Sequence, residues 1–124
     1  MNDLHCERTK DTPGIRYTPD GSVLVIEGES YPENAFAFYT PVLEWLDDYL
    51  ASASSLTLRV RITYMNSSST KCTFDILDRL QAAFGEGKEI KVVWEYDADN
   101  PRAQELAEDF REDFTFPFDI VQTK

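Results

Sequence analysis

A run of hydroxyl-bearing side chains follows Asn66 in the stretch YMNSSSTKC, which covers residues 64–72. Its members are Ser67, Ser68, Ser69 and Thr70, and Lys71 comes directly after them. Side chains of this type support three kinds of chemistry: capping of a helix, nucleophilic attack and acceptance of a phosphoryl group. The surrounding sequence has to decide among the three.

Nucleophilic catalysis has one match in this run. Ser68 and Lys71 have the S-x-x-K spacing, in which a lysine one helical turn after a serine can activate it. The companion S-D-N and K-T-G motifs are missing, and 124 residues are too few for that fold. A Ser-His-Asp triad is not indicated either, because the only histidine, His5, lies in an expected tail. We therefore expect no catalytic residue and no enzyme; a lone S-x-x-K enzyme is kept as an alternative that predicts acylation of Ser68.

Metal and nucleotide sites are not indicated. The stretch DADNPRAQE, residues 97–105, begins like a calcium loop, but Arg102 takes the sixth position, where such a loop needs glycine. A strand end followed by a helix, with Asn100 as cap and Pro101 at the first position, explains the stretch more simply. No glycine-rich phosphate loop is present. We expect no metal and no cofactor.

Capping and phosphorylation remain open from the residues alone. A single cap, Ser68 or Ser69, satisfies a helix start, with Asn66 shaping the turn, and the other hydroxyls are then surplus. A phosphoryl group at a strand-to-helix turn would meet free amides and the positive end of the helix dipole, and Lys71 would lie near it. The residues alone favour the cap over the switch.

Composition limits the partners. The chain has 23 acidic and 12 basic residues, a formal net charge of −11, and no apolar run of membrane-spanning length. Such a surface repels nucleic acid and anionic lipid, so we expect neither nucleic-acid binding nor membrane insertion. It is either simply well solvated or it docks on a basic patch of a partner.

Cys6 and Cys72 occur in unlike contexts, which predicts free thiols in a reducing cytoplasm.

The elements that must position the hydroxyl run follow from periodicity. Residues 1–12 are predicted as a flexible tail and residues 13–124 as a single domain. Two extended runs around Pro19-Asp20-Gly21 predict a hairpin. Beyond it the pattern predicts a helix after Pro32, kinked or restarted at Pro41, then a strand over 56–65, a helix over 71–88, a strand over 89–97, a helix over 100–113 and a final strand over 116–122. This order predicts an α/β fold with a mixed central sheet of about five strands and about three to four helices.

Two patterns within these elements concern the surface. Leu56, Leu58, Val60, Ile62 and Tyr64 alternate with polar residues, so we expect all five on the buried face of their strand. Phe36, Phe38 and Trp45 exceed the needs of one core-facing helix stripe. They form either a wide buried face or an exposed patch for protein docking.

Five stretches of the chain have the form of family motifs: GESYPENA at 28–35, FYTPVLEWLDDYL at 38–50, YMNSSSTKC at 64–72, VVWEYD at 92–97 and AEDFREDFTFPF at 107–118. Together they resemble the SiaC family of bacterial regulatory phosphoproteins. The resemblance extends from about Thr12 to Val121. It implies a STAS-like fold and a partner switch of the anti-sigma-factor-antagonist type. In that switch a kinase phosphorylates one hydroxyl, a PP2C-type phosphatase reverses it, and the unphosphorylated protein binds and activates a GGDEF diguanylate cyclase, which promotes cyclic-di-GMP synthesis and biofilm formation or aggregation.

The resemblance also assigns residues. The family acceptor directly follows the asparagine of its N-T-S-S motif, which here is Ser67, a serine in place of threonine, with Ser68, Ser69 and Thr70 as weaker candidates. Asn66 would shape the turn and Lys71 would neighbour the phosphate. The expected partner-binding residues are Glu29, Tyr31, Glu33, Asn34, Phe38 and Trp45. The alternative is a STAS-like module that binds a ligand or a protein without being phosphorylated.

Overall fold

A six-stranded sheet with strands in chain order lies at the centre of residues 4–123, the part of the chain that the computed structural model describes. The strands are β1 (His5–Cys6), β2 (Gly14–Thr18), β3 (Val23–Ser30), β4 (Ser55–Met65), β5 (Glu89–Tyr96) and β6 (Phe118–Gln122). The helices in these residues are α1 (Ala35–Ser52), α2 (Ser67–Gly85) and α3 (Pro101–Arg111). The predicted mixed α/β sheet is confirmed, with one strand more than expected.

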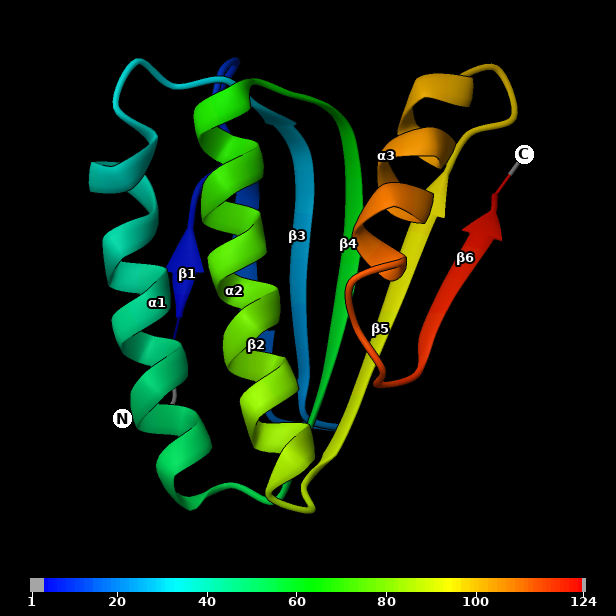
Figure 1. Ribbon diagram of the computed structural model, residues 1–124. Coiled ribbons are helices and arrows are strands. Elements are labelled where there is room, and N and C mark those ends of the chain that lie inside the picture. The colour runs from blue at the N-terminus through cyan, green and yellow to red at the C-terminus, as the bar shows by residue number, and fades with distance from the viewer. Residues whose placement is uncertain (1–3, 124) are drawn as a thin grey trace.

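The connections place all three helices on one face of the sheet (Figure 1). The pairs β1–β2 and β2–β3 are antiparallel, whereas β3, β4, β5 and β6 are parallel neighbours joined through a helix each time. Each crossover advances by one strand in the same direction, so crossovers of the same hand put every helix on the same side. The carboxyl ends of β3, β4 and β5 and the amino ends of the three helices therefore lie at one end of the molecule.

The two faces of the sheet differ in chemistry. The face under the helices is apolar and fully buried, with Leu24, Ile26, Leu58, Val60, Val92 and Trp94. Each such side chain stabilises the fold by about 1.5–3 kcal/mol. The other face carries ion pairs between neighbouring strands: Arg16–Glu27, Arg59–Glu95 and Lys91–Asp119. Alternation along the strands thus builds a two-layer protein with one solvated sheet face.

Strand β1 was not predicted. His5 and Cys6 pair with Arg16 and Ile15, and the Leu4 carbonyl accepts a hydrogen bond from the Tyr17 amide. Residues 4–12, which we expected in a flexible tail, therefore contact the sheet; residues 1–3 lie outside the described residues. A strand of two residues is too short for its alternation to be recognised in a sequence.

Helix α1 is continuous through Pro41 and begins later than predicted. Asn34 caps it by accepting the Ala37 amide at 3.1 Å, so the helix starts at Ala35 and not at Pro32. Proline removes the hydrogen bond to the carbonyl four residues earlier, that of Ala37. Ala37 is exposed, so water can satisfy this carbonyl. The helix therefore does not restart at Pro41.

Tyr64 is not on the buried face of β4, contrary to expectation. Gly28 of β3 pairs with Ile62, but Glu29 pairs with Tyr64, so Thr63 is an extra residue in β4. This β-bulge reverses the alternation beyond it. Tyr64 is 53% exposed as a result, and Met65 takes the buried position.

None of the helices in residues 4–123 combines the length and the apolarity needed to cross a membrane.

Candidate functional site

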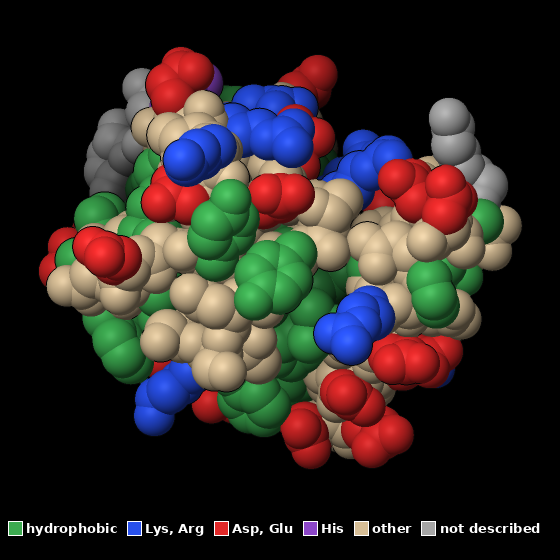
Figure 2. All heavy atoms as spheres, turned by 90° about the horizontal axis from the view of Figure 1, so that it is seen from above, with side chains coloured by type: hydrophobic (Ala, Val, Ile, Leu, Met, Phe, Trp, Pro, Cys, Tyr) green, Lys and Arg blue, Asp and Glu red, His purple; other side chains and the backbone are tan. Residues whose placement is uncertain are grey.

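The hydroxyl run lies at the end of the sheet where β3 and β4 finish. These strands are parallel neighbours, with Ser30 opposite Met65, so the segments that follow them start side by side. The Asn66 amide donates to the Ser30 carbonyl at 2.9 Å. The structure thus brings the loop at 29–34 next to the hydroxyl run. Figure 2 looks onto this end of the molecule and shows apolar side chains near its middle, with charged side chains around them.

Asn66 holds the turn through both ends of its side-chain amide. Oδ1 accepts the Ser69 amide at 2.9 Å and so caps α2, and Nδ2 donates to the Pro32 carbonyl at 3.3 Å. The cap of α2 is therefore Asn66, and the prediction of Ser68 or Ser69 as cap was wrong. Asparagine is among the best N-cap residues because its short amide reaches the amide of the third helical residue. The same side chain ties α2 to the loop before α1.

The four hydroxyls have different environments. Ser67 and Ser68, the first two residues of α2, are exposed. Ser69 is fully buried and accepts a hydrogen bond from Ser30 Oγ at 2.8 Å. Thr70 is partly buried and donates to the Asn66 carbonyl at 3.0 Å. Within this run only Ser67 and Ser68 are open to a modifying enzyme.

A buried chain of hydroxyls supports the turn from below. Ser30 Oγ lies 2.6 Å from the Tyr39 hydroxyl and donates to Ser69, so Tyr39 is the donor to Ser30. Burial raises the pKa of Tyr39 to about 12, which keeps this donor protonated at neutral pH. The chain connects α1, β3 and α2. Sequence reasoning missed Ser30 and Tyr39; the one signal was a small polar residue at an inward position of β3.

The remaining catalytic and metal hypotheses gain nothing from the geometry. No hydrogen bond joins Ser68 to Lys71 in the described part of the chain, where Lys71 is exposed on the first turn of α2. In residues 97–105, the stretch compared above with a calcium loop, Asp97 accepts a hydrogen bond from Arg61, and Asn100 caps α3. Residues 4–123 contain no group of three or more His, Cys, Asp or Glu side chains that could hold a metal ion.

The residues expected to bind a partner fall into exposed and buried sets. In the 29–34 loop, Tyr31 is 37% exposed and its ring contacts that of Tyr64 edge-on at 5.8 Å. Glu33 and Asn34 are exposed, and Glu29 is half-buried. The loop therefore presents side chains to solvent beside the hydroxyl run. Sequence reasoning missed Tyr64, because the bulge that exposes it leaves no periodic signal.

The aromatic residues of α1 are divided between core and surface. Trp45 is 6% exposed and stacks on Tyr49 at 4.9 Å, so it is a core residue and offers no docking surface. Phe38 is partly buried against Tyr39. Phe36, in the first turn of α1, is 51% exposed. Of the two alternatives, the wide buried face holds for Trp45, whereas Phe36 is exposed and its role in docking stays a prediction.

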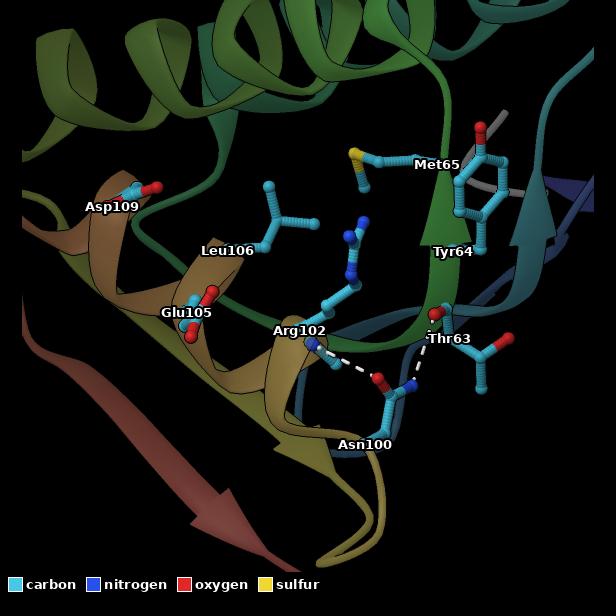
Figure 3. Close-up of a pocket in the computed structure, with 9 residues that line it drawn as sticks. Thr63, Tyr64, Met65, Asn100, Arg102, Glu105, Leu106 and Asp109 are labelled. Atoms are coloured by element: carbon cyan, nitrogen blue, oxygen red, sulfur yellow. Dashed lines mark hydrogen bonds between the residues drawn. The ribbon is translucent and has the colours of Figure 1, made fainter.

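A hollow of about 450 Å³ lies between the end of β4 and α3, next to Tyr64 (Figure 3). Met65 and Leu106 contribute apolar surface to it, and the Arg102 side chain points into it. Asn100 fixes one side: its Nδ2 donates to the Thr63 carbonyl at 3.1 Å while its Oδ1 accepts the Ala103 amide at 3.2 Å. The hollow joins the exposed tyrosine pair to the first turn of α3.

Comparison with known proteins agrees with this geometry. A family model described as SiaC family regulatory phosphoprotein matches residues 6–123. An uncharacterized protein of Pseudomonas aeruginosa (strain UCBPP-PA14) is 42% identical over 121 residues, which are 97% of this chain and 96% of that protein.

Solved structures with the same fold come from the same species. The crystal structure of apo-SiaC from Pseudomonas aeruginosa superposes with a TM-score of 0.92 at 41% identity, over 98% of this chain and 99% of that one. SiaC in a crystal structure of the diguanylate cyclase SiaD in complex with its activator SiaC also has a TM-score of 0.92 and 41% identity, over 97% and 99% of the two chains.

Proposed function

The chain belongs to the SiaC family of regulatory phosphoproteins, and from this premise we propose that it is a non-catalytic partner switch. Its unphosphorylated form binds and activates a GGDEF diguanylate cyclase and so controls cyclic-di-GMP signalling and biofilm formation or aggregation. A cognate kinase phosphorylates Ser67, and a PP2C-type phosphatase removes the phosphoryl group. Phosphorylation at the turn blocks cyclase binding. The cytoplasmic location expected from the sequence is part of the same proposal.

The accessibility of Ser67 carries this proposal. Ser67 is exposed, directly follows the capping residue Asn66 and is the first residue of α2. The buried Ser69 and the bonded Thr70 are poor acceptors by comparison. A kinase has to surround the acceptor hydroxyl, so the geometry favours Ser67 and leaves Ser68 as the second candidate.

The surroundings of Ser67 suit a charge switch. The first amides of a helix have no internal partner, and the helix dipole favours negative charge there, so a phosphoryl group on Ser67 is stabilised locally. Lys71 lies four residues further along the same face of α2. The Asn66 bonds and the buried hydroxyl chain hold the turn, so phosphate changes the surface charge by nearly −2 with little change of fold. A partner that packs on this surface would then have to desolvate the phosphate.

Phosphorylation in vitro tests the acceptor. The protein is incubated with its cognate kinase and ATP, and the modified residue is mapped by mass spectrometry. We expect one phosphate, on Ser67, that is absent from Ser67→Ala and is removed by the phosphatase. Absence of phosphate from all of residues 67–70 would contradict the proposal.

Cyclase binding tests the switch. We expect Ser67→Ala to bind and activate the cyclase like the wild type, and Ser67→Asp to bind at least about tenfold more weakly. Ser54→Asp is the matched control, because Ser54 is exposed in the connection from α1 to β4 at the opposite end of the molecule. Equal binding by Ser67→Ala and Ser67→Asp would refute the switch and favour a module that works without phosphorylation.

A further inference from the structure

Lysine and arginine side chains near the site are free, whereas those on the open sheet face are paired. Arg59 and Arg61 form ion pairs with Glu95 and Asp97. In the described residues, Lys71 in the first turn of α2 and Arg102 in the first turn of α3 have no ion pair or side-chain hydrogen bond. The first turns of α2 and α3 lie at the same end of the molecule (Figure 1), so both residues belong to this end. Although the whole chain is acidic, this end therefore has cations available for a partner.

Exposed apolar side chains gather at the same end. Among the described residues the large exposed ones are Tyr31, Phe36, Tyr64 and Val121. The first three belong to the β3–α1 loop, the first turn of α1 and the end of β4, which share this end. Tyr31 and Tyr64 form a pair with their rings in edge-on contact. Tyrosine, methionine and arginine are enriched in protein interfaces. Tyrosine and arginine are also common among the few residues that carry most of the binding energy.

The hollow beside Tyr64 has the shape and chemistry to take a side chain. Its apolar surface comes from Met65 and Leu106, and Arg102 projects over this surface toward Met65 (Figure 3). Glu105 and Asp109 line the α3 side of the hollow, and neither pairs with Arg102 in the described residues. An unpaired guanidinium next to apolar surface can bind a carboxylate with two parallel hydrogen bonds.

We propose that the Tyr31–Tyr64 pair and the adjoining hollow form the docking surface for an acidic partner segment that presents a large apolar side chain beside a carboxylate. The apolar side chain enters the hollow over Met65, and the carboxylate pairs with Arg102. The inference rests on the proposed function, since the partner in question is the cyclase. The proposal differs from the sequence-based alternative in which this acidic protein docks on a basic patch of its partner.

The acidic character of the partner also explains the direction of the switch. Ser67 follows Met65 by two residues and shares a face of α2 with Lys71. A phosphoryl group at this position competes for the nearby cations and repels a carboxylate that approaches the hollow. A basic partner segment would be attracted by the phosphate, so phosphorylation would then promote binding instead of preventing it.

Charge reversal at two positions of α3 tests the proposed ion pair between Arg102 and a carboxylate of the partner. The affinity of the unphosphorylated protein for purified GGDEF cyclase is measured by calorimetry for Arg102→Glu and for Arg111→Glu. Arg111 is a matched control, because it is exposed at the other end of the same helix and forms no ion pair in the described residues. We expect at least about tenfold weaker binding for Arg102→Glu and less than about twofold change for Arg111→Glu. Arg102→Gln, which keeps the length of the side chain, should give an intermediate loss.

Truncation of an aromatic side chain tests the proposed apolar contact between the partner and the Tyr31–Tyr64 pair. Tyr64→Ala should weaken cyclase binding at least about tenfold, and Val121→Ala, an exposed apolar residue of β6, should not. Urea unfolding confirms that each variant is folded.

The outcomes separate the two proposals. Suppose that the wild type binds the cyclase, that Ser67→Asp does not, and that Arg102→Glu and Tyr64→Ala bind like the wild type. The proposed docking surface is then wrong, and the proposed switch stands. Tighter binding by Arg102→Glu would indicate a basic partner and also overturn the inference. If the unphosphorylated wild type does not bind the cyclase at all, both proposals fail.

Discussion

Replacing Asn66 with alanine removes two hydrogen bonds that hold the candidate site. The cap to the Ser69 amide, at 2.9 Å, contributes about 1 kcal/mol to stability. The bond from Nδ2 to the Pro32 carbonyl, at 3.3 Å and partly buried, contributes about 0.5–1.5 kcal/mol more. We therefore expect Asn66→Ala to lower the free energy of unfolding by roughly 1.5–2.5 kcal/mol.

The matched control is Asn34→Ala at the start of α1. Asn34 is exposed and accepts only the Ala37 amide, at 3.1 Å, so its loss should cost about 1 kcal/mol. The difference between Asn66→Ala and Asn34→Ala isolates the bond to Pro32. Asn66→Asp keeps the cap acceptor but loses the donor to the Pro32 carbonyl, so we expect its stability to lie between those of the wild type and Asn66→Ala.

Urea unfolding followed by tryptophan fluorescence measures these differences, with the slope against urea concentration compared among variants. Equal losses for Asn66→Ala and Asn34→Ala would show that the tie to Pro32 contributes nothing. A loss below about 0.3 kcal/mol for Asn66→Ala would refute the cap itself, since caps contribute at least about 0.5 kcal/mol.

Three further outcomes follow from the geometry. Tyr39 keeps its proton up to a pKa of about 12 in the folded state, whereas an unfolded tyrosine loses it near pH 10, so stability should fall between pH 10 and 12. Between pH 10 and 12 the free energy of unfolding, measured with urea, should fall by up to about 2–3 kcal/mol more for the wild type than for Tyr39→Phe. Parallel pH profiles of the two proteins would contradict this prediction. Gly28 has φ of +125°, so Gly28→Ala should destabilise by about 1–3 kcal/mol, whereas Gly85→Ala, with open space around it, should not, as thermal unfolding can show. In kinase-treated Ser67→Ala, mass spectrometry should find no phosphate on the buried Ser69; its presence there would contradict the accessibility argument.

The fold was predictable from the sequence to the level of element order. Strands and helices longer than about five residues repeat their apolar positions often enough for the period to be recognised, as in Leu56 to Ile62 and in Ile76 to Leu80. The exceptions were local. The two residues of β1 are too few to show alternation, and Pro41 is compatible with either a break or a continuous helix, depending on whether the Ala37 carbonyl can reach water.

The candidate site was predictable in part. Motif resemblance assigned Ser67 and Asn66, and both lie at the turn between β4 and α2. The choice of Asn66 over Ser69 as cap was not predictable, because both are good capping residues and their roles depend on where the helix starts. In the structure the Ser69 hydroxyl is buried and accepts a hydrogen bond from Ser30, which lies 39 residues earlier in the chain, whereas Asn66 caps the helix.

The sequence by itself therefore determined the alternation of strands and helices, the acidic surface and the strand-to-helix turn that holds the proposed acceptor, because these depend on residues that are close in the chain. Only the tertiary structure decided which of the hydroxyls is buried and which of the aromatic residues are exposed. Tyr64 shows the reason most directly. Its exposure comes from a bulge in the pairing of β4 with β3, and strand pairing joins residues such as Glu29 and Tyr64 that are far apart in the sequence.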